Sequence, residues 1–123
     1  MFNALLNQFA RFMEAPSPRR RFDEGKANDL ARDSLNWILD KMASVYEPEQ
    51  QNAVLWGGIL AGIGRYAREC GLPLNEELAR NVATVATEAL LKMMARQPSV
   101  EQARLNVECA VFAGIKKYCE AIG

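Results

Sequence analysis

Apolar residues near the start of the chain recur at steps of three and four, which places them along one side of a helix. They are Phe2, Leu5, Leu6, Phe9, Phe12 and Met13. Pro16 and Pro18 follow, and proline disfavours helix both at its own position and at the one before it. The pattern therefore predicts an amphipathic helix over residues 1–14 and an extended linker over residues 15–22.

Four longer helical patterns follow the linker. They cover approximately residues 23–46, 49–70, 75–97 and 99–122. Pro48 stands in a favoured first-turn position, and Asn75 is a typical N-cap residue. Ser99 and Gln102 have the spacing of a capping box, which opens the last helix after Pro98. No alternating strand pattern or hairpin turn is visible, so the sequence predicts an all-α fold with a four-helix core.

The same spacing assigns a buried face to each helix. In the pattern that begins at Asp23, the expected inward side chains are Ala27, Ala31, Ile38, Met42 and Val45. The opposite face, which we expect to be solvated, carries Asp29, Asp33, Asn36 and Asp40. In the pattern that follows Asn75, the expected inward side chains are Leu78, Val82, Val85, Ala89 and Met93.

The chain resembles itself when it is shifted by 52 residues, which pairs residues 23–71 with 75–123 without a gap. Of these 49 pairs, 13 are identical, whereas roughly three to four identities are expected by chance. The segment Ala-Gly-Ile-x-(Arg/Lys)-Tyr occurs in both halves. Phase matching of two alanine-rich helices is one explanation for such a likeness. We favour the other, two pseudo-symmetric helical hairpins, with repeat 1 over residues 23–71 and repeat 2 over residues 75–123.

Gly62 and Gly114 stand inside helical patterns, where glycine costs about 1 kcal/mol relative to alanine. We expect a close helix-to-helix approach to compensate for this cost. Tyr66 and Tyr118 follow one turn later on the same face, where a ring fills space beside the crossing while its hydroxyl reaches water or a backbone carbonyl. These four residues are therefore predicted to mark a helix crossing, which is a structural role.

The second and fourth of the longer helices carry an additional apolar side. Its residues are Ala53, Leu60 and Ala67 in one helix and Leu105, Cys109, Phe112 and Cys119 in the other. A helix that is apolar on two sides must be covered twice, and four helices are not expected to enclose two such members. Either the helix at residues 1–14 or a second subunit is expected to complete the cover, and we predict a homodimer.

The amino-acid composition restricts the kinds of chemistry that the chain is expected to perform. The chain has 123 residues, half of them hydrophobic, which predicts a single helical domain over residues 1–123. Basic and acidic residues balance at 15 each, and histidine, the commonest general base and metal ligand, is absent. Three cysteines without metal-ligand spacing favour reduced thiols and a cytoplasmic location. We expect no cofactor, no metal and no membrane span, because the longest apolar run is twelve residues.

Two features are candidates for binding: the apolar stripe of residues 1–14 and a run of three arginines. The candidate partner-binding residues are Phe2, Leu5, Phe9, Phe12, Arg19, Arg20 and Arg21. Signatures of a catalytic nucleophile or base are missing, so we do not expect an enzyme. The predicted function is a non-enzymatic protein-protein interaction module, which acts as an adaptor, inhibitor or regulator. The alternative is a nucleic-acid-binding regulator, in which the three arginines make weak, non-specific phosphate contacts.

Overall fold

The computed structural model describes residues 22–122, which form four helices packed against one another. The helices are α2 (Glu24–Met42), α3 (Pro48–Glu69), α4 (Glu76–Met94) and α5 (Val100–Ile122). No strand occurs among the described residues. The prediction of an all-α fold with a four-helix core is confirmed, whereas the helix predicted at residues 1–14 lies outside the described residues.

Three helix starts carry a capping side chain, and two of these, at Asn75 and Ser99, are the ones predicted from the sequence. The side chains of Asp23 and Asn75 each accept a hydrogen bond from the backbone N–H three residues later, at 3.0 Å. The Ser99 hydroxyl accepts one from the backbone N–H of Gln102 at 3.1 Å. The Gln102 amide group, however, donates to Asn106 one turn further on, so the capping box is half-formed.

Helix ends differ in how they are closed. α2 stops at Met42, four residues before the predicted end, because Ser44 and Val45 donate backbone hydrogen bonds over three residues and tighten the chain into a turn. At the end of α3, Gly71 adopts a positive φ of 69°. Leu72 then donates its backbone N–H to the Ala67 carbonyl at 2.8 Å. This arrangement is a Schellman motif, which turns the chain sharply toward α4.

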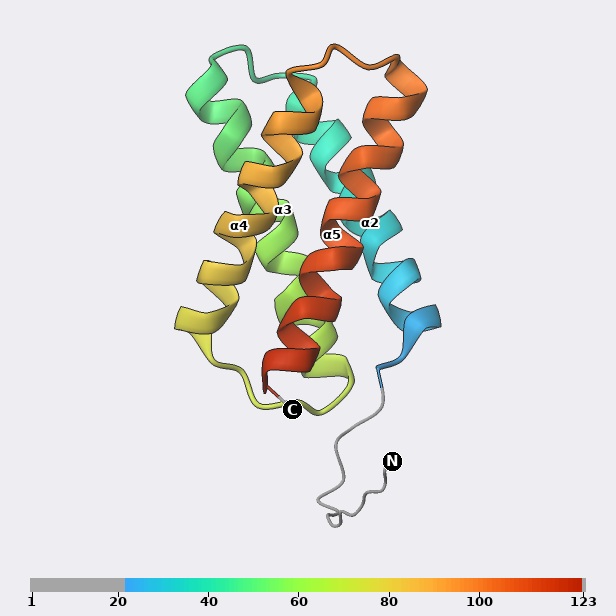
Figure 1. Ribbon diagram of the computed structural model, residues 1–123, viewed down its shortest axis with the longest axis vertical. Coiled ribbons are helices and arrows are strands. Elements are labelled where there is room, and N and C mark those ends of the chain that lie inside the picture. The colour runs from blue at the N-terminus through green and yellow to red at the C-terminus, as the bar shows by residue number, and fades with distance from the viewer. Residues whose placement is uncertain (1–21, 123) are drawn as a thin grey trace.

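The two central helices are α3 and α5. Each of them contacts the other three helices, while α2 and α4 lie on opposite sides and do not contact each other (Figure 1). The α2–α3 and α4–α5 connections lie at one end of the bundle, and the α3–α4 connection lies at the other. This placement covers much of the additional apolar side of the central helices, so that Ala67 and Cys119 are buried. Ala53, Leu105 and Cys109 stay exposed.

The core lies along the α3–α5 crossing. Its largest fully buried side chains are Tyr66, Tyr118, Ile38, Ile59, Ile63, Leu90, Ile115 and Val111. A Cβ atom at Gly62 would lie 2.9 Å from the Cγ1 of Val111, and one at Gly114 would lie 3.1 Å from the Cγ2 of Ile59. Both glycines therefore let α3 and α5 approach closely, each against a branched side chain of the opposite helix.

The two buried tyrosines tie the central helices to the N-termini of the outer ones. The Tyr66 hydroxyl accepts a hydrogen bond from the backbone N–H of Asp23 at 2.8 Å. The Tyr118 hydroxyl accepts one from the backbone N–H of Asn75, also at 2.8 Å, and donates to the Pro73 carbonyl at 2.8 Å. These bonds fix where α2 and α4 begin relative to the core.

The predicted inward face is right for part of α2 and wrong for part of α4. In α2, Ala27, Ala31 and Ile38 are buried and Met42 is half-buried, while Val45, also half-buried, lies beyond the end of the helix. In α4, Val85 and Ala89 are exposed. The buried residues of α4 are instead Ala79, Val82, Ala83, Thr87 and Leu90. The small side chains of Ala79 and Ala83 allow the closest approach to the core, so α4 is rotated toward them and away from Val85.

Candidate functional site

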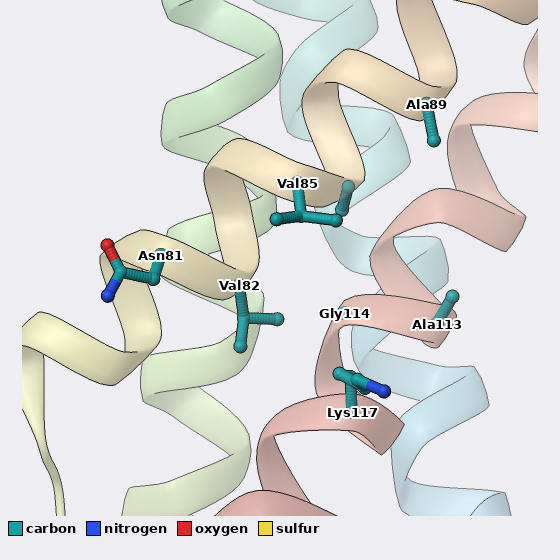
Figure 2. A pocket seen from close by; sticks show the side chains of 8 residues that line it. Asn81, Val82, Val85, Ala89, Ala113, Gly114 and Lys117 are labelled. Atoms are coloured by element: carbon teal, nitrogen blue, oxygen red, sulfur yellow. The ribbon is translucent and has the colours of Figure 1, made fainter.

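The candidate functional site is an open apolar groove between α4 and α5, with a volume of about 360 Å³. We call it the α4/α5 groove. Its lining residues are Asn81, Val82, Val85, Ala86, Ala89, Ala113, Gly114 and Lys117. The residues from α4 and those from α5 line opposite sides of the opening (Figure 2). Six of the eight lining residues have no polar side-chain atom, so the groove can bind a ligand through that ligand's apolar surface.

Small residues at the helix crossing create the hollow. Gly114 leaves room for the close approach of α3, where an added Cβ atom would make a tight contact with Ile59, and Ala86 lies 3.9 Å from the position of that Cβ atom. Ala113 adds only a methyl group on the outer side. Val85 stands at the rim with 66% of its surface exposed. A valine that is predicted to be buried therefore lies open to solvent beside a hollow that nothing in the described residues fills.

The positions 52 residues earlier look different. Val85, Ala89 and Lys117 correspond to Asp33, Trp37 and Arg65. Arg65 on α3 forms a salt bridge with Asp33 on α2 at 3.3 Å, which spans the two helices. The α2–α3 surface at these positions is thus crossed by an ion pair, whereas the groove is apolar and open.

Polar groups of the groove lie toward one end. Lys117 and Asn81 are its two polar lining residues, and no carboxylate lines it. The ammonium group of Lys117 gives that end a positive charge, so an acidic group of a ligand would be favoured there. The groove therefore combines an apolar body with one charged end, a combination that fits an amphipathic helix.

The described chain begins beside α5. The ring of Phe22 lies 5.9 Å from the Tyr66 ring and 5.5 Å from the Phe112 ring, in an edge-to-face arrangement with the latter. The ammonium of Lys116 lies 6.0 Å from the centre of the Phe22 ring. Lys116 is the sequence neighbour of Lys117 in the groove, so Phe22 lies one face of α5 away from the groove.

Two other hollows are less suited to an apolar ligand. One, of about 670 Å³ between α2 and α5, is lined mainly by polar and charged residues, among them Arg32 and Glu108, which pair at 3.9 Å. The other, of about 260 Å³ between α3 and α4, includes Glu76 and Arg80, which pair at 3.3 Å. A ligand in either hollow would have to compete with these charged groups and their water.

The described residues whose pKa is shifted, Lys26, Arg65, Tyr66 and Glu69, lie outside the groove. Burial raises the pKa of the Tyr66 phenol above its ordinary value. Hydrogen bonds from Lys26 and then Arg65 lower the pKa of the Glu69 carboxyl group at the surface of α3. Among residues 22–122, no group of three or more His, Cys, Asp or Glu side chains is placed to hold a metal ion. Within that range, no helix is long and apolar enough to cross a membrane.

The predicted site residues divide into two groups. Phe2, Leu5, Phe9, Phe12 and Arg19–Arg21 lie outside the described residues. Gly62, Tyr66, Gly114 and Tyr118 lie at the α3–α5 crossing and the adjoining helix starts. Sequence reasoning missed the groove, although it singled out Val82, Val85 and Ala89. The available signal was the width of the apolar arc of α4, which has more apolar positions than one buried face needs.

Comparison with known proteins gives no relative: no family model, curated protein or solved structure matches this chain.

Proposed function

We propose that the chain is a non-enzymatic protein-interaction module whose α4/α5 groove binds an amphipathic helix. The observation that carries this proposal is the exposure of Val85 and Ala89 beside a hollow floored by Ala86 and Gly114. A helix that presents bulky apolar side chains at i, i+3, i+4 and i+7 would bury this surface. Lys117 would pair with an acidic residue at one end of that helix.

The charge of the described residues supports a protein partner rather than a nucleic acid. Residues 22–122 hold 11 basic and 14 acidic side chains, so the bundle carries an acidic excess. A surface that binds phosphates needs clustered lysines and arginines to release counterions. The arginine run that favours the alternative function, Arg19–Arg21, lies outside the described residues, and nucleic-acid binding stays a prediction from the sequence.

We also propose that the two hairpins descend from one duplicated unit. One pair of equivalent hydrogen bonds supports this. Tyr66 receives the N–H of Asp23, and Tyr118, 52 residues later, receives the N–H of Asn75, which also lies 52 residues after Asp23. The two hairpins then differ at the groove, where Val85 and Lys117 stand at the positions of the Asp33–Arg65 ion pair. Homodimerisation is a separate prediction, which the mass of the full chain in light scattering tests.

A fluorescence anisotropy titration tests the proposed function. The probe is a labelled 14-residue helical peptide with leucine at i, i+3, i+4 and i+7, and its control is a peptide with the same residues in scrambled order. The full chain is expected to bind the first peptide more tightly than the second. Val85→Asp is expected to weaken binding at least tenfold, whereas Val100→Asp, which changes another exposed valine, on α5, is expected to leave it unchanged. Equal affinity for both peptides, or equal effects of both variants, would overturn the proposal.

A further inference from the structure

We infer that residues 1–14 of the same chain occupy the α4/α5 groove when no partner is bound, and this inference rests on the proposed function. The groove needs an apolar cover, and residues 1–14 are the amphipathic segment of the chain that the described helices do not account for. A partner helix would then bind by displacing this segment. The segment also indicates what kind of partner would displace it, because a competing helix must present a similar stripe of large apolar side chains.

The place where the described chain begins supports this occupant. Phe22 is held against α5 by Phe112 and Lys116. Seven residues, 15–21, connect it to the segment, and an extended chain of that length reaches at most about 25 Å. A helix with its side chains is about 10–12 Å across. The connector is therefore long enough to cross α5 and place Glu14 beside Lys117.

The shapes of the two surfaces are complementary. The stripe of residues 1–14 presents large side chains, among them Phe2, Leu5, Phe9 and Phe12. The groove presents small ones, Ala86, Ala89, Ala113 and Gly114. Large side chains that fill a hollow lined by small ones bury the most apolar surface for a given helix length. A 14-residue helix is about 21 Å long, and the side of the groove on α4 runs from Asn81 to Ala89, about 12 Å, so the helix is long enough to cover it.

The α2/α5 hollow is the competing position, because Phe112 also adjoins that side of α5. It is lined by charged residues, including Arg32, Arg104 and Glu108. If the segment covered this hollow, these side chains would lose their hydrating water, which is unfavourable. The segment offers only Arg11 and Glu14 as charged partners. Val100 lines this hollow and Val85 lines the groove. Contacts of the segment with one valine or the other therefore show which of the two hollows it occupies.

Nuclear Overhauser effects between valine methyl groups and phenylalanine rings test the inference in the full chain. Contacts are expected between the Val85 methyl groups and ring protons of Phe9 or Phe12, and not between Val100 and these rings. In a mixture of chains labelled only on valine with chains labelled only on phenylalanine, the contacts are expected to vanish, because they form within one chain. Contacts to Val100 instead, contacts that persist in the mixture, or none to residues 1–14 would overturn the inference.

A second measurement separates failure of the inference from failure of the proposed function. A tethered segment acts as a competitor at an effective concentration on the order of millimolar. Phe9→Asp is therefore expected to tighten binding of the leucine peptide about tenfold, while Asn7→Asp, on the opposite helix face, is expected to change it little. If Phe9→Asp has no effect but Val85→Asp still weakens binding, the groove binds helices and only the occupant is wrong. If neither variant changes binding, both proposals fail.

Discussion

Gly62 of α3 lies directly against Val111 of α5, because a Cβ atom at Gly62 would stand 2.9 Å from the Val111 Cγ1 and 3.0 Å from the Ser34 hydroxyl. Val111 is fully buried and stiff at its branched Cβ, so it has little freedom to move away. Gly64, half a turn further along α3, has open space where its Cβ would lie. Two glycines on one helix thus have opposite packing environments.

This contrast gives the first prediction. Gly62→Ala and Gly62→Leu are expected to destabilise the fold by about 1–3 kcal/mol through overpacking, with leucine the worse. Gly64→Ala is expected to stabilise it by about 0.5–1 kcal/mol, because alanine is the better helix former and meets nothing. Urea unfolding followed by circular dichroism measures both effects. Wild-type-like stability of Gly62→Leu would show that α3 and α5 do not cross at this point.

Removal of the tyrosine hydroxyls gives a second prediction. Tyr118→Phe removes the hydrogen bonds with the Asn75 N–H and the Pro73 carbonyl, and Tyr66→Phe removes the bond with the Asp23 N–H. At about 1 kcal/mol for each of these bonds, we expect Tyr118→Phe to lower the free energy of unfolding by about 2 kcal/mol and Tyr66→Phe to lower it by at least about 1 kcal/mol. Denaturant unfolding of both variants measures these losses. Wild-type-like stability of either variant would contradict the role of its hydroxyl in holding the start of the outer helix.

Acid sensitivity gives a third prediction. Lys26 and Arg65 lower the pKa of Glu69 in the folded chain below its ordinary value of 4.5. Its contribution to stability is therefore present at neutral pH and is lost as the pH falls from 4.5 through the lower folded value. Unfolding by urea across this range is expected to show a shallower loss of stability in Glu69→Gln than in the wild type. Glu120→Gln, an exposed substitution on α5, is the control, and an equally shallow loss in that variant would contradict the assignment to Glu69.

The arginine run gives a fourth prediction. Electrophoretic titration against duplex and single-stranded DNA is expected to show at most weak binding, which moderate salt abolishes, because three arginines neutralise few phosphates. The variant with Arg19, Arg20 and Arg21 all changed to alanine is expected to behave like the wild type at moderate salt. Binding that survives moderate salt and disappears in this variant would favour the nucleic-acid-binding alternative.

Much of the fold could be predicted from the sequence because its signals are local. Proline and capping residues set the helix starts, so the caps at Asn75 and Ser99 could be predicted from their own neighbourhoods. The end of α2 was harder to predict, because no glycine or proline follows Met42 directly. The rotation of α4 could not be read from periodicity, because its apolar arc is wide and the choice of face depends on which small residues fit against α3 and α5.

The groove was out of reach of sequence reasoning for a related reason. A hollow belongs to two helices at once, and neither the exposed Val85 nor the small Ala113 indicates by itself that the other lies opposite. The spacing of apolar residues predicts that a helix face is buried. It does not indicate whether that face is covered by another helix of the bundle or by a separate segment or partner. The exposed fraction of Val85, 66%, is the observation that separates these cases.

The most direct test of the central claim is the response of the valine methyl signals in the full chain to the leucine peptide. We predict that the signals of Val82 and Val85 in the α4/α5 groove shift progressively as the peptide is added, while the signal of Val100 stays in place. Shifts confined to Val100, or no valine shift at saturating peptide, would contradict the claim that this groove binds helices.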